Sequence, residues 1–293
     1  YPILILMKNN PPIWAWFLFS VPLLAWLIAH SLTTDKELFY AINQLSGIGS
    51  IYAWVFFNFL GNAWGVFAFS LPLLLYAPRL LISAIFAGII AGIITRPIKE
   101  ILQLPRPPSL FDHSTFFILG KPLTTLSMPS GHTVTAFAIA TAYLFSLNKD
   151  RQQKFIWLIG LACITGMTRI VLGAHFPSDV FAGAAIGLFS GVLGSQMGNY
   201  VPDHLLTPTS WLSKLIVIGS VVCAYVLLTQ KMDFEETYLY QVIAVAVILV
   251  TLVQFLSINL KTSIFERFLF LYIYKRFFKV SMSISSMSVE FLH

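Results

Sequence analysis

The sequence predicts an all-α protein, built as a polytopic bundle of transmembrane helices. Hydrophobic residues fill 57% of the 293 positions, and Asp, Glu, Lys and Arg together fill only 10%. An ordinary soluble domain carries about 25% charged residues. Apolar runs also recur along the chain, each close to the roughly 20 residues that a helix needs to cross a bilayer. These two observations exclude an ordinary soluble fold.

Each apolar run is expected to be a helix, because backbone groups cannot stay unpaired in lipid. The first run is expected to be retained and not cleaved as a signal peptide, because no small-residue cleavage site follows it. The third and fourth runs are short, and polar residues adjoin them. The eight predicted spans are Ile13–His30, Ile51–Tyr76, Leu80–Thr95, His132–Leu147, Phe155–Leu172, Val180–Met197, Trp211–Leu228 and Tyr238–Leu256.

The basic residues between these runs predict the orientation. They alternate with the runs so that they fall on one side, which the positive-inside rule assigns to the cytoplasm. The formal charge of +6 therefore indicates topology and anionic lipid, and not nucleic acid. The loops at 31–50, 96–131, 173–178 and 231–237 are expected on the opposite side. The basic residues expected on the cytoplasmic side are Lys8, Arg79, Lys149, Arg151, Lys154, Lys261, Arg267, Lys275, Arg276 and Lys279.

Two segments outside the spans are expected to lie on the membrane surface. Asp35–Leu45 predicts a short amphipathic helix at the outer interface, with an apolar face that includes Phe39. The basic and aromatic segment Ile264–Val280 is expected at the cytoplasmic interface. Cys163 and Cys223 lie in apolar runs without metal-ligand spacing, so we expect both to be small buried hydrophobic residues.

The segment Pro129–His132 opens the fourth run and predicts an anion site. Ser130 is a good N-cap residue, and Gly131 lets an anion approach the backbone. The first amides of the helix have no intrahelical partner and carry the positive end of its dipole, which suits phosphate. His132 lies in the same turn, so we expect its imidazole beside the bound anion.

The segment from Arg169 to Asp179 predicts a nucleophile. Pro177 favours the first turn of a helix and keeps Phe176 out of the helical region. His175 then lies just before the helix, and Asp179 lies in its first turn. The carboxylate can bind one imidazole nitrogen, which fixes the tautomer and leaves the other nitrogen free to attack.

A third segment supplies further positive charge. Lys99 and Arg106 follow the third run, and prolines on both sides of Arg106 stiffen the chain there. Arg169 adds another cation. Guanidinium groups match phosphate oxygens in a bidentate manner.

Together the three segments resemble the motifs of the type 2 phosphatidic acid phosphatase (PAP2) superfamily. One departure is Thr168, which stands where the third motif begins with serine. The resemblance covers about residues 35–197 and six of the spans. The matches are Lys99 to Arg106-Pro107 for KxxxxxxRP, Pro129–His132 for PSGH, and Arg169, His175 and Asp179 for SRxxxxxHxxxD.

Each residue also has a structural explanation: Lys99 and Arg106 as interfacial side chains, His132 as a helix-end residue, and Asp179 as a first-turn carboxylate. Three independent spacings together favour the site.

The resemblance implies a metal-free reaction without a cofactor. His175 attacks phosphorus and forms a phosphohistidine, Asp179 orients it, and His132 protonates the leaving oxygen. The implied ligands of the phosphoryl oxygens are Lys99, Arg106, Ser130, Gly131 and Arg169. Water then hydrolyses the intermediate.

The function expected from this resemblance is hydrolysis of a lipid phosphate or diphosphate, of the undecaprenyl diphosphate, phosphatidylglycerophosphate or phosphatidate type. A lipid phosphotransferase, including one that modifies lipid A phosphates, and a non-enzymatic lipid transporter are the alternatives. The expected partners are the lipid substrate and the bilayer, with no nucleic acid and no obligate protein. The expected location is a bacterial inner membrane, with the site on the periplasmic side.

Three regions are expected along the chain. Residues 1–200 would form a six-helix PAP2 core, residues 201–260 two additional transmembrane helices, and residues 261–293 a basic cytoplasmic tail.

Overall fold

The computed structural model of the protein describes residues 10–31, 34–232 and 234–261. These residues form helices and connecting loops, with no β-strand among them, which confirms the all-α class. The chain divides into two compact units, Tyr1–Leu249 and Val250–His293. The described part of the second unit, residues 250–261, is helical. The predicted interfacial segment Ile264–Val280 lies outside the described residues.

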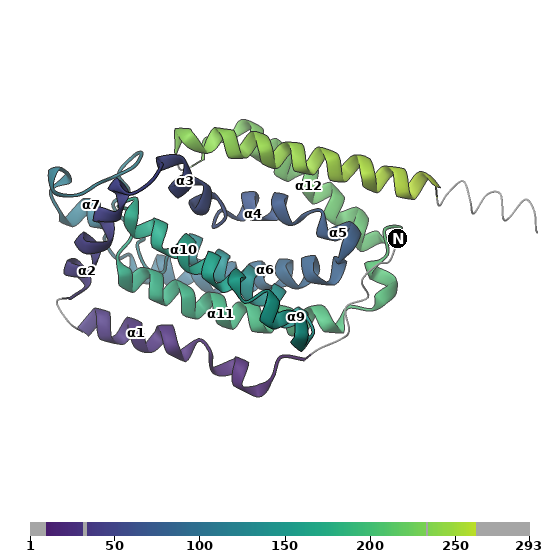
Figure 1. The fold of residues 1–293 in the computed structure, drawn as a ribbon, viewed down its shortest axis with the longest axis horizontal. Helices are drawn as coiled ribbons and strands as arrows, with labels where there is room; N and C mark the ends of the chain where they lie inside the picture. Colours follow the sequence, from purple (N-terminus) through teal and green to yellow (C-terminus); the bar gives the residue numbers. More distant parts are fainter. Residues whose placement is uncertain (1–9, 32–33, 233, 262–293) are drawn as a thin grey trace, which may run out of the picture. The chain divides into compact units, whose positions relative to one another are not determined.

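Four helices of the first unit carry the site: α6 (Pro78–Leu102), α8 (Gly131–Ser146), α10 (Trp157–Val171) and α11 (Pro177–Tyr200). Helix α11 packs on α8, on α6 and on α1 (Ser20–Ser31). Figure 1 shows α1 running beside α11. Small residues allow the close approach. A Cβ atom on Gly187 would lie only 2.5 Å from Cβ of Phe137 in α8, and one on Gly194 would overlap Ala87 in α6. Such contacts are typical of helix interfaces in membranes.

One predicted span is wrong as a single helix. Ile51–Tyr76 forms three pieces, α3 (Ile51–Phe59), α4 (Ala63–Ser70) and α5 (Leu73–Tyr76). Helices α3 and α4 meet at a bend of 78°. Asn62 caps α4, because its side-chain oxygen accepts the amide hydrogens of Trp64 and Gly65. Gly61, at the bend, would bring a Cβ atom within 2.8 Å of His132, so the break lets this segment lie directly against the PSGH turn.

Within the described residues, length and composition identify five helices that could cross a membrane, or six if the bent pair is one span. The five are Ile13–His30, Pro78–Leu110, Pro177–Tyr200, Asp203–Thr229 and Glu235–Lys261. Helix α8 has 16 residues, the length of the predicted span His132–Leu147, and α10 has 15, which is shorter than the predicted span Phe155–Leu172; neither is among these five. The chain is an integral membrane protein.

The loops expected on one side of the membrane meet at one end of the first unit. Helix α2 (Thr34–Asn43), 3₁₀ helix η2 (Gln44–Gly47), α7 (Pro107–Leu110) and η3 (His113–Thr115) lie there. Phe39 of α2 was expected at the interface, but it is fully buried among the rings of Phe111, Phe116 and Phe176. Helix α2 therefore packs on the site loops and does not merely lie on a surface.

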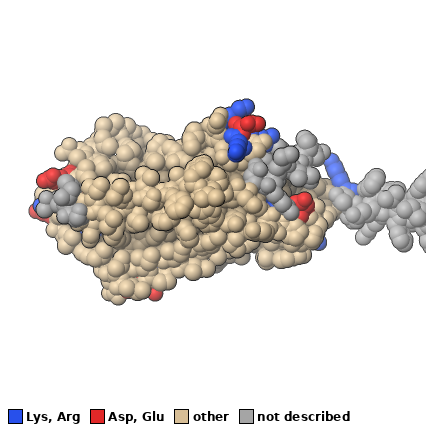
Figure 2. Space-filling model, turned by 90° about the horizontal axis from the view of Figure 1, so that it is seen from below, with Lys and Arg blue, Asp and Glu red and all other residues tan. Residues whose placement is uncertain are grey.

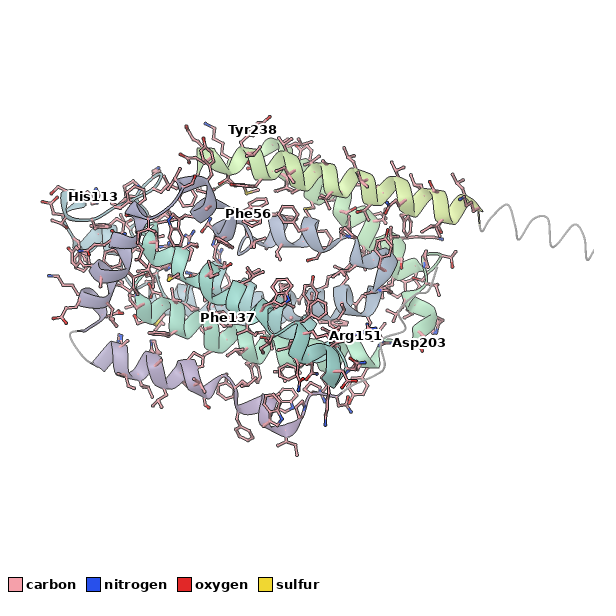
Figure 3. All side chains as sticks on the ribbon, viewed as in Figure 1. Phe56, His113, Phe137, Arg151, Asp203 and Tyr238 are labelled. Atoms are coloured by element: carbon pink, nitrogen blue, oxygen red, sulfur yellow. The ribbon has the colours of Figure 1, made fainter. Side chains whose placement is uncertain are left out.

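The opposite end of the first unit carries Arg79, Lys149, Arg151 and Lys154, four of the cationic residues expected in the cytoplasm. Arg151 of α9 (Lys149–Lys154) and Asp203 of η4 (Asp203–Leu206) lie there, far from His113 (Figure 3). Buried Arg79 forms an ion pair with Asp203 and donates to the carbonyl of Gly198 at 2.6 Å. The face drawn in Figure 2 is nearly free of charged atoms between these regions, as a lipid-facing band requires.

The remaining helices are η1 (Ile13–Phe17), α12 (Trp211–Thr229), η5 (Glu235–Thr237) and the helix at 238–261. Cys223 of α12 is buried as expected, but the prediction for Cys163 is wrong, because this residue is exposed. Its side chain lines an apolar groove among α1, α8, α10 and α11.

Candidate active site

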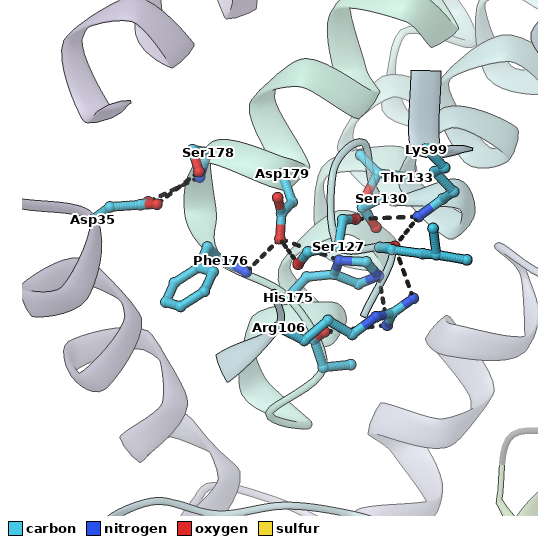
Figure 4. Close-up of polar contacts among 12 residues, drawn as sticks. Asp35, Lys99, Arg106, Ser127, Ser130, Thr133, His175, Phe176, Ser178 and Asp179 are labelled. Atoms are coloured by element: carbon cyan, nitrogen blue, oxygen red, sulfur yellow. Dashed lines mark hydrogen bonds and ion pairs between the residues drawn. The ribbon is translucent and has the colours of Figure 1, made fainter. Parts of the chain in front are cut away.

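The three polar segments singled out in the sequence meet at one end of the bundle. The end of α6 supplies Lys99, and the loop after it supplies Arg106. The turn between α10 and α11 supplies His175, and the first turn of α11 supplies Asp179. The loop at 124–130 runs between them and leads into α8. Figure 4 shows these side chains converging on the imidazole of His175.

His175 is buried, with 2% of its surface exposed, and both ring nitrogens have a partner. Nδ1 lies 3.3 Å from Oδ2 of Asp179, and Nε2 lies 3.1 Å from Nη1 of Arg106. A guanidinium group can only donate hydrogen bonds, and an ionised carboxylate can only accept them. The ring therefore carries its proton on Nδ1, and the lone pair on Nε2 faces Arg106. This is the tautomer that a nucleophilic Nε2 needs.

The surroundings keep this imidazole neutral. Burial lowers the pKa of His175 well below its ordinary value, and the positive charges of Arg106, Arg169 and Lys99 lower it further. The charge of His132 lowers this pKa as well. His132 lies in the first turn of α8, and the residue before that helix, Ser130, donates its backbone amide hydrogen to the carbonyl of Asp179. Because a neutral imidazole is the nucleophilic form, the ring is ready to react at neutral pH.

Asp179 holds the turn together through one oxygen atom. Its Oδ2 accepts hydrogen bonds from the hydroxyl of Ser127, from the backbone amide of Phe176 at 2.9 Å, and from His175. The first of these joins the loop before α8 to the first turn of α11. The backbone amide of Ser130 strengthens this junction by donating to the carbonyl of Asp179 at 3.0 Å.

Arg106 is fixed by backbone carbonyl groups. Its guanidinium donates to Thr125 at 2.8 Å, to Ala174 at 3.2 Å and to Leu126 at 3.3 Å. These bonds orient the group so that one Nη lies against the free nitrogen of His175. Its charge is thus held where a phosphoryl group bonded to Nε2 would carry its oxygens.

Lys99 and Arg169 complete the positive surroundings. The ammonium group of Lys99 donates to the carbonyls of Leu126 at 2.6 Å and Ser127 at 3.1 Å. Buried Arg169 donates to the side-chain oxygen of Asn58 in α3, and its own carbonyl accepts the amide hydrogens of Ala174 and His175. The backbone of Arg169 therefore shapes the turn that carries His175.

The PSGH turn differs from expectation in one detail. Ser130 occupies the N-cap position of α8, but its hydroxyl does not cap the helix; it accepts a hydrogen bond from the Thr133 hydroxyl at 3.0 Å. The first amides of α8 are thus not capped by this side chain. A Cβ atom on Gly131 would meet no atom within 4 Å, so open space lies in front of the turn.

Sequence reasoning missed four polar residues that support the site. Asp35 of α2 accepts the amide and hydroxyl hydrogens of Ser178 at 2.9 and 2.6 Å, beside Asp179. Asn43 joins the loop at Phe117 to the last carbonyls of α10. Asn58 accepts a hydrogen bond from Arg169, and Ser127 donates one to Asp179. The available signal was weak: Asn58 is an amide inside an apolar run, which is costly in a membrane.

The serine-to-threonine departure in the third motif has a simple explanation. Thr168 is buried, and its hydroxyl donates to the carbonyl of Thr165 at 2.7 Å within α10. The hydroxyl thus bonds to its own helix. Within the described part of the chain, no group of three or more His, Cys, Asp or Glu side chains is arranged to hold a metal ion.

Comparison with known proteins finds a family match over the central part of the chain. The profile of the "PAP2 superfamily" matches residues 79–203, which include the three motifs. This part of the chain is therefore similar to the PAP2 superfamily. The PAP2 domain begins at the start of α6 and ends at η4, so α12 and the helix at 238–261 lie outside it.

Several curated relatives that match this chain are named as phosphatases. A lipid A 1-phosphatase of Porphyromonas gingivalis is 35% identical over 121 residues, which are 37% of this chain and 26% of the relative. Undecaprenyl-diphosphatase BcrC of Bacillus subtilis is 34% identical over 113 residues, 37% of this chain and 54% of the relative. The chain spans 26–44% of the length of the three lipid A 1-phosphatases it matches.

Among solved structures, Aquifex aeolicus LpxE is 30% identical, with a TM-score of 0.48; the match covers 56% of this chain and 95% of that chain.

Proposed function

We propose that this protein is a lipid phosphatase that hydrolyses a lipid phosphate or diphosphate through a phosphohistidine on His175. The arrangement of the buried imidazole carries the proposal: Nδ1 bonds to a carboxylate and Nε2 faces a guanidinium. This is the geometry of an activated nucleophile with its orienting group. The phosphatase activities of the curated relatives support the same class of reaction.

The first step transfers the phosphoryl group to the protein. Nε2 of His175 attacks phosphorus, an N–P bond forms, and the P–O bond to the lipid breaks. His132 gives a proton to the departing oxygen. Asp179 stabilises the positive charge that the imidazole gains, while Arg106, Lys99, Arg169 and the opening turn of α8 hold the phosphoryl oxygens.

The second step returns the imidazole. A water molecule attacks phosphorus, His132 accepts its proton, and the N–P bond breaks to release inorganic phosphate. Ser130 and Gly131 bind the oxygens through the start of α8, where a helix terminus favours an anion. The reaction needs no metal, because the cations and the helix terminus supply the positive charge.

A hydrophobic groove supports a lipid as the substrate. It has a volume of about 650 Å³, and its lining is apolar apart from Thr141 and Cys163. Pro177 and Val180, in the first turn of α11, line it, so it extends to the turn that carries His175 and Asp179. A lipid tail in this groove would leave the phosphate near the site.

The position of the site relative to the cationic end supports a location in the membrane. The site lies at the end opposite Arg79 and Arg151, so the positive-inside rule favours its position on the periplasmic side of a bacterial inner membrane. Undecaprenyl diphosphate, phosphatidylglycerophosphate and phosphatidate are the substrate types we propose. The bilayer and the lipid are the partners required.

A phosphate-release assay on detergent-solubilised lipids tests the proposal. Wild-type protein should release phosphate from at least one lipid in EDTA and without an acceptor lipid, and His175→Ala should not. Thr168→Ser, which keeps the hydroxyl, is a matched control and should retain activity. Release that depends on an acceptor lipid would instead identify a phosphotransferase. Turnover by His175→Ala equal to wild type would refute the nucleophile.

A further inference from the structure

A second cavity adjoins the site on the side of Arg169. It has a volume of about 300 Å³, at the lower end of the range of small-molecule sites. Arg169 and Ala174 form part of its wall, and the carbonyl of Ala174 binds the same guanidinium that faces His175. The cavity is therefore next to the reacting centre and is not a remote pocket.

Two lysines line this cavity in addition to Arg169. Lys121 comes from the loop between η3 and α8, and Lys231 comes from the loop after α12. The remaining lining is mostly apolar, and no Asp or Glu is part of it among the described residues. Apolar walls reduce the screening of charge, so three cations here create a strong preference for an anion.

The loop that carries Lys231 is held in place at the wall of the cavity. Phe234 packs against Val55 of α3 and Leu172 at the end of α10. The side chain of Gln241 donates to the carbonyls of Leu227 at 2.7 Å and Gln230 at 3.0 Å. The position of Lys231 is thus set by packing and hydrogen bonds on both sides of it.

The loop that carries Lys121 is also anchored to α10. The amide of Leu119 donates to the carbonyl of Leu172 at 3.3 Å. Gly173 has a φ of +76°, and a Cβ atom there would overlap the carbonyl of Phe117. The glycine after α10 therefore lets the loop that contains Phe117 approach closely, and this loop brings Lys121 to the cavity.

We propose that Lys121, Lys231 and Arg169 form a second anion subsite, which binds a second phosphate group of the same lipid headgroup. This inference rests on the proposed lipid phosphatase activity and names its substrate class: lipids with two phosphate groups. Lys231 lies outside residues 79–203, so the C-terminal pair of helices supplies a specificity determinant to the PAP2 domain.

Matched substrates test the subsite. Dioleoyl phosphatidylglycerophosphate and dioleoyl phosphatidate have the same tails, and the first carries an additional glycerol phosphate group. A polyprenyl diphosphate and its monophosphate form a second pair, which differs by one phosphate alone. Lys121→Met and Lys231→Met remove charge but keep an unbranched side chain. We expect each to lower kcat/KM roughly tenfold for the two-phosphate lipids and less than about threefold for the one-phosphate lipids, as loss of a charged hydrogen bond predicts.

Controls separate this effect from general electrostatics. Lys149→Met, at the other end of the unit, should change neither substrate, and Lys231→Arg should retain most of the two-phosphate activity. Equal losses on both members of a pair, or no loss from the double lysine variant, would overturn the subsite. His175→Ala reports separately on the phosphatase: if it turns over lipid normally, the proposed function fails as well.

Discussion

Replacement of Asp179 by asparagine separates charge from geometry at the site. Asp179 uses only Oδ2 for its three hydrogen bonds to Ser127, Phe176 and His175. An asparagine whose oxygen takes the Oδ2 position can accept all three, so the fold and the tautomer of His175 are retained. Only the negative charge beside Nδ1 is lost.

The distance sets the size of the effect. Two unit charges 3.3 Å apart attract by about 5 kcal/mol at an effective dielectric constant of about 20. That attraction exists only when the imidazole becomes positive, as it does when Nε2 bonds to phosphorus. Asp179→Asn should therefore lower kcat by roughly 10³–10⁴-fold, since each 1.36 kcal/mol corresponds to about tenfold in rate.

Phosphate release from a detergent-solubilised lipid measures this loss, and the thermal midpoint measured in parallel reports on folding. Asp179→Asn should unfold within a few degrees of wild type. Asp179→Ala should lose similar activity and also several kcal/mol of stability, because three buried donors lose their acceptor at about 1–3 kcal/mol each. If kcat of a folded Asp179→Asn protein stays within tenfold of wild type, this reasoning is wrong.

Three further predictions follow from the same contacts. Arg106→Gln removes a charge that lowers the pKa of His175, so the loss of activity at acidic pH should begin at a higher pH than in wild type; a pH profile of kcat/KM that does not move would contradict this. Gly131→Ala should leave the thermal midpoint nearly unchanged, because the added Cβ atom meets no other atom. It should raise KM, because the substrate phosphate is proposed to occupy that space, and an unchanged KM would exclude phosphate binding there. Asn43→Ala should lower the free energy of unfolding by about 2–4 kcal/mol, since four hydrogen bonds between Asn43, Phe117 and the end of α10 are lost. Denaturant unfolding measures this change, and a change under about 1 kcal/mol would show that water replaces the lost hydrogen bonds.

The motif residues could be predicted from sequence because their spacing is local. Pro177 starts α11, so His175 and Asp179 had to share a turn, and the structure shows their hydrogen bond. The apolar composition in the same way predicted α6 and α11. These inferences needed only helix geometry and membrane physics.

The supporting residues could not be predicted, because their partners are distant in sequence. Asn43 bonds to residues 74 and 128 positions away, and Asp35 bonds to Ser178, 143 positions away. The break at residues 60–62 had a local signal, Gly61 followed by the capping residue Asn62. Hydropathy outweighed that signal, because the flanking residues are apolar enough to span a membrane as one helix.

The central claim is a covalent bond between phosphorus and Nε2 of His175. The most direct measurement mixes the protein with a lipid substrate, quenches it in alkali, where phosphohistidine survives, and maps the added phosphoryl group by peptide mass spectrometry. We expect the phosphoryl group on the peptide that contains His175. Its amount should be higher in wild type than in an Asp179 variant, and it should be absent from His175→Ala. A phosphoryl group on another residue would contradict the covalent bond to His175. Steady turnover by the wild-type protein with no trapped phosphoryl group would contradict it as well.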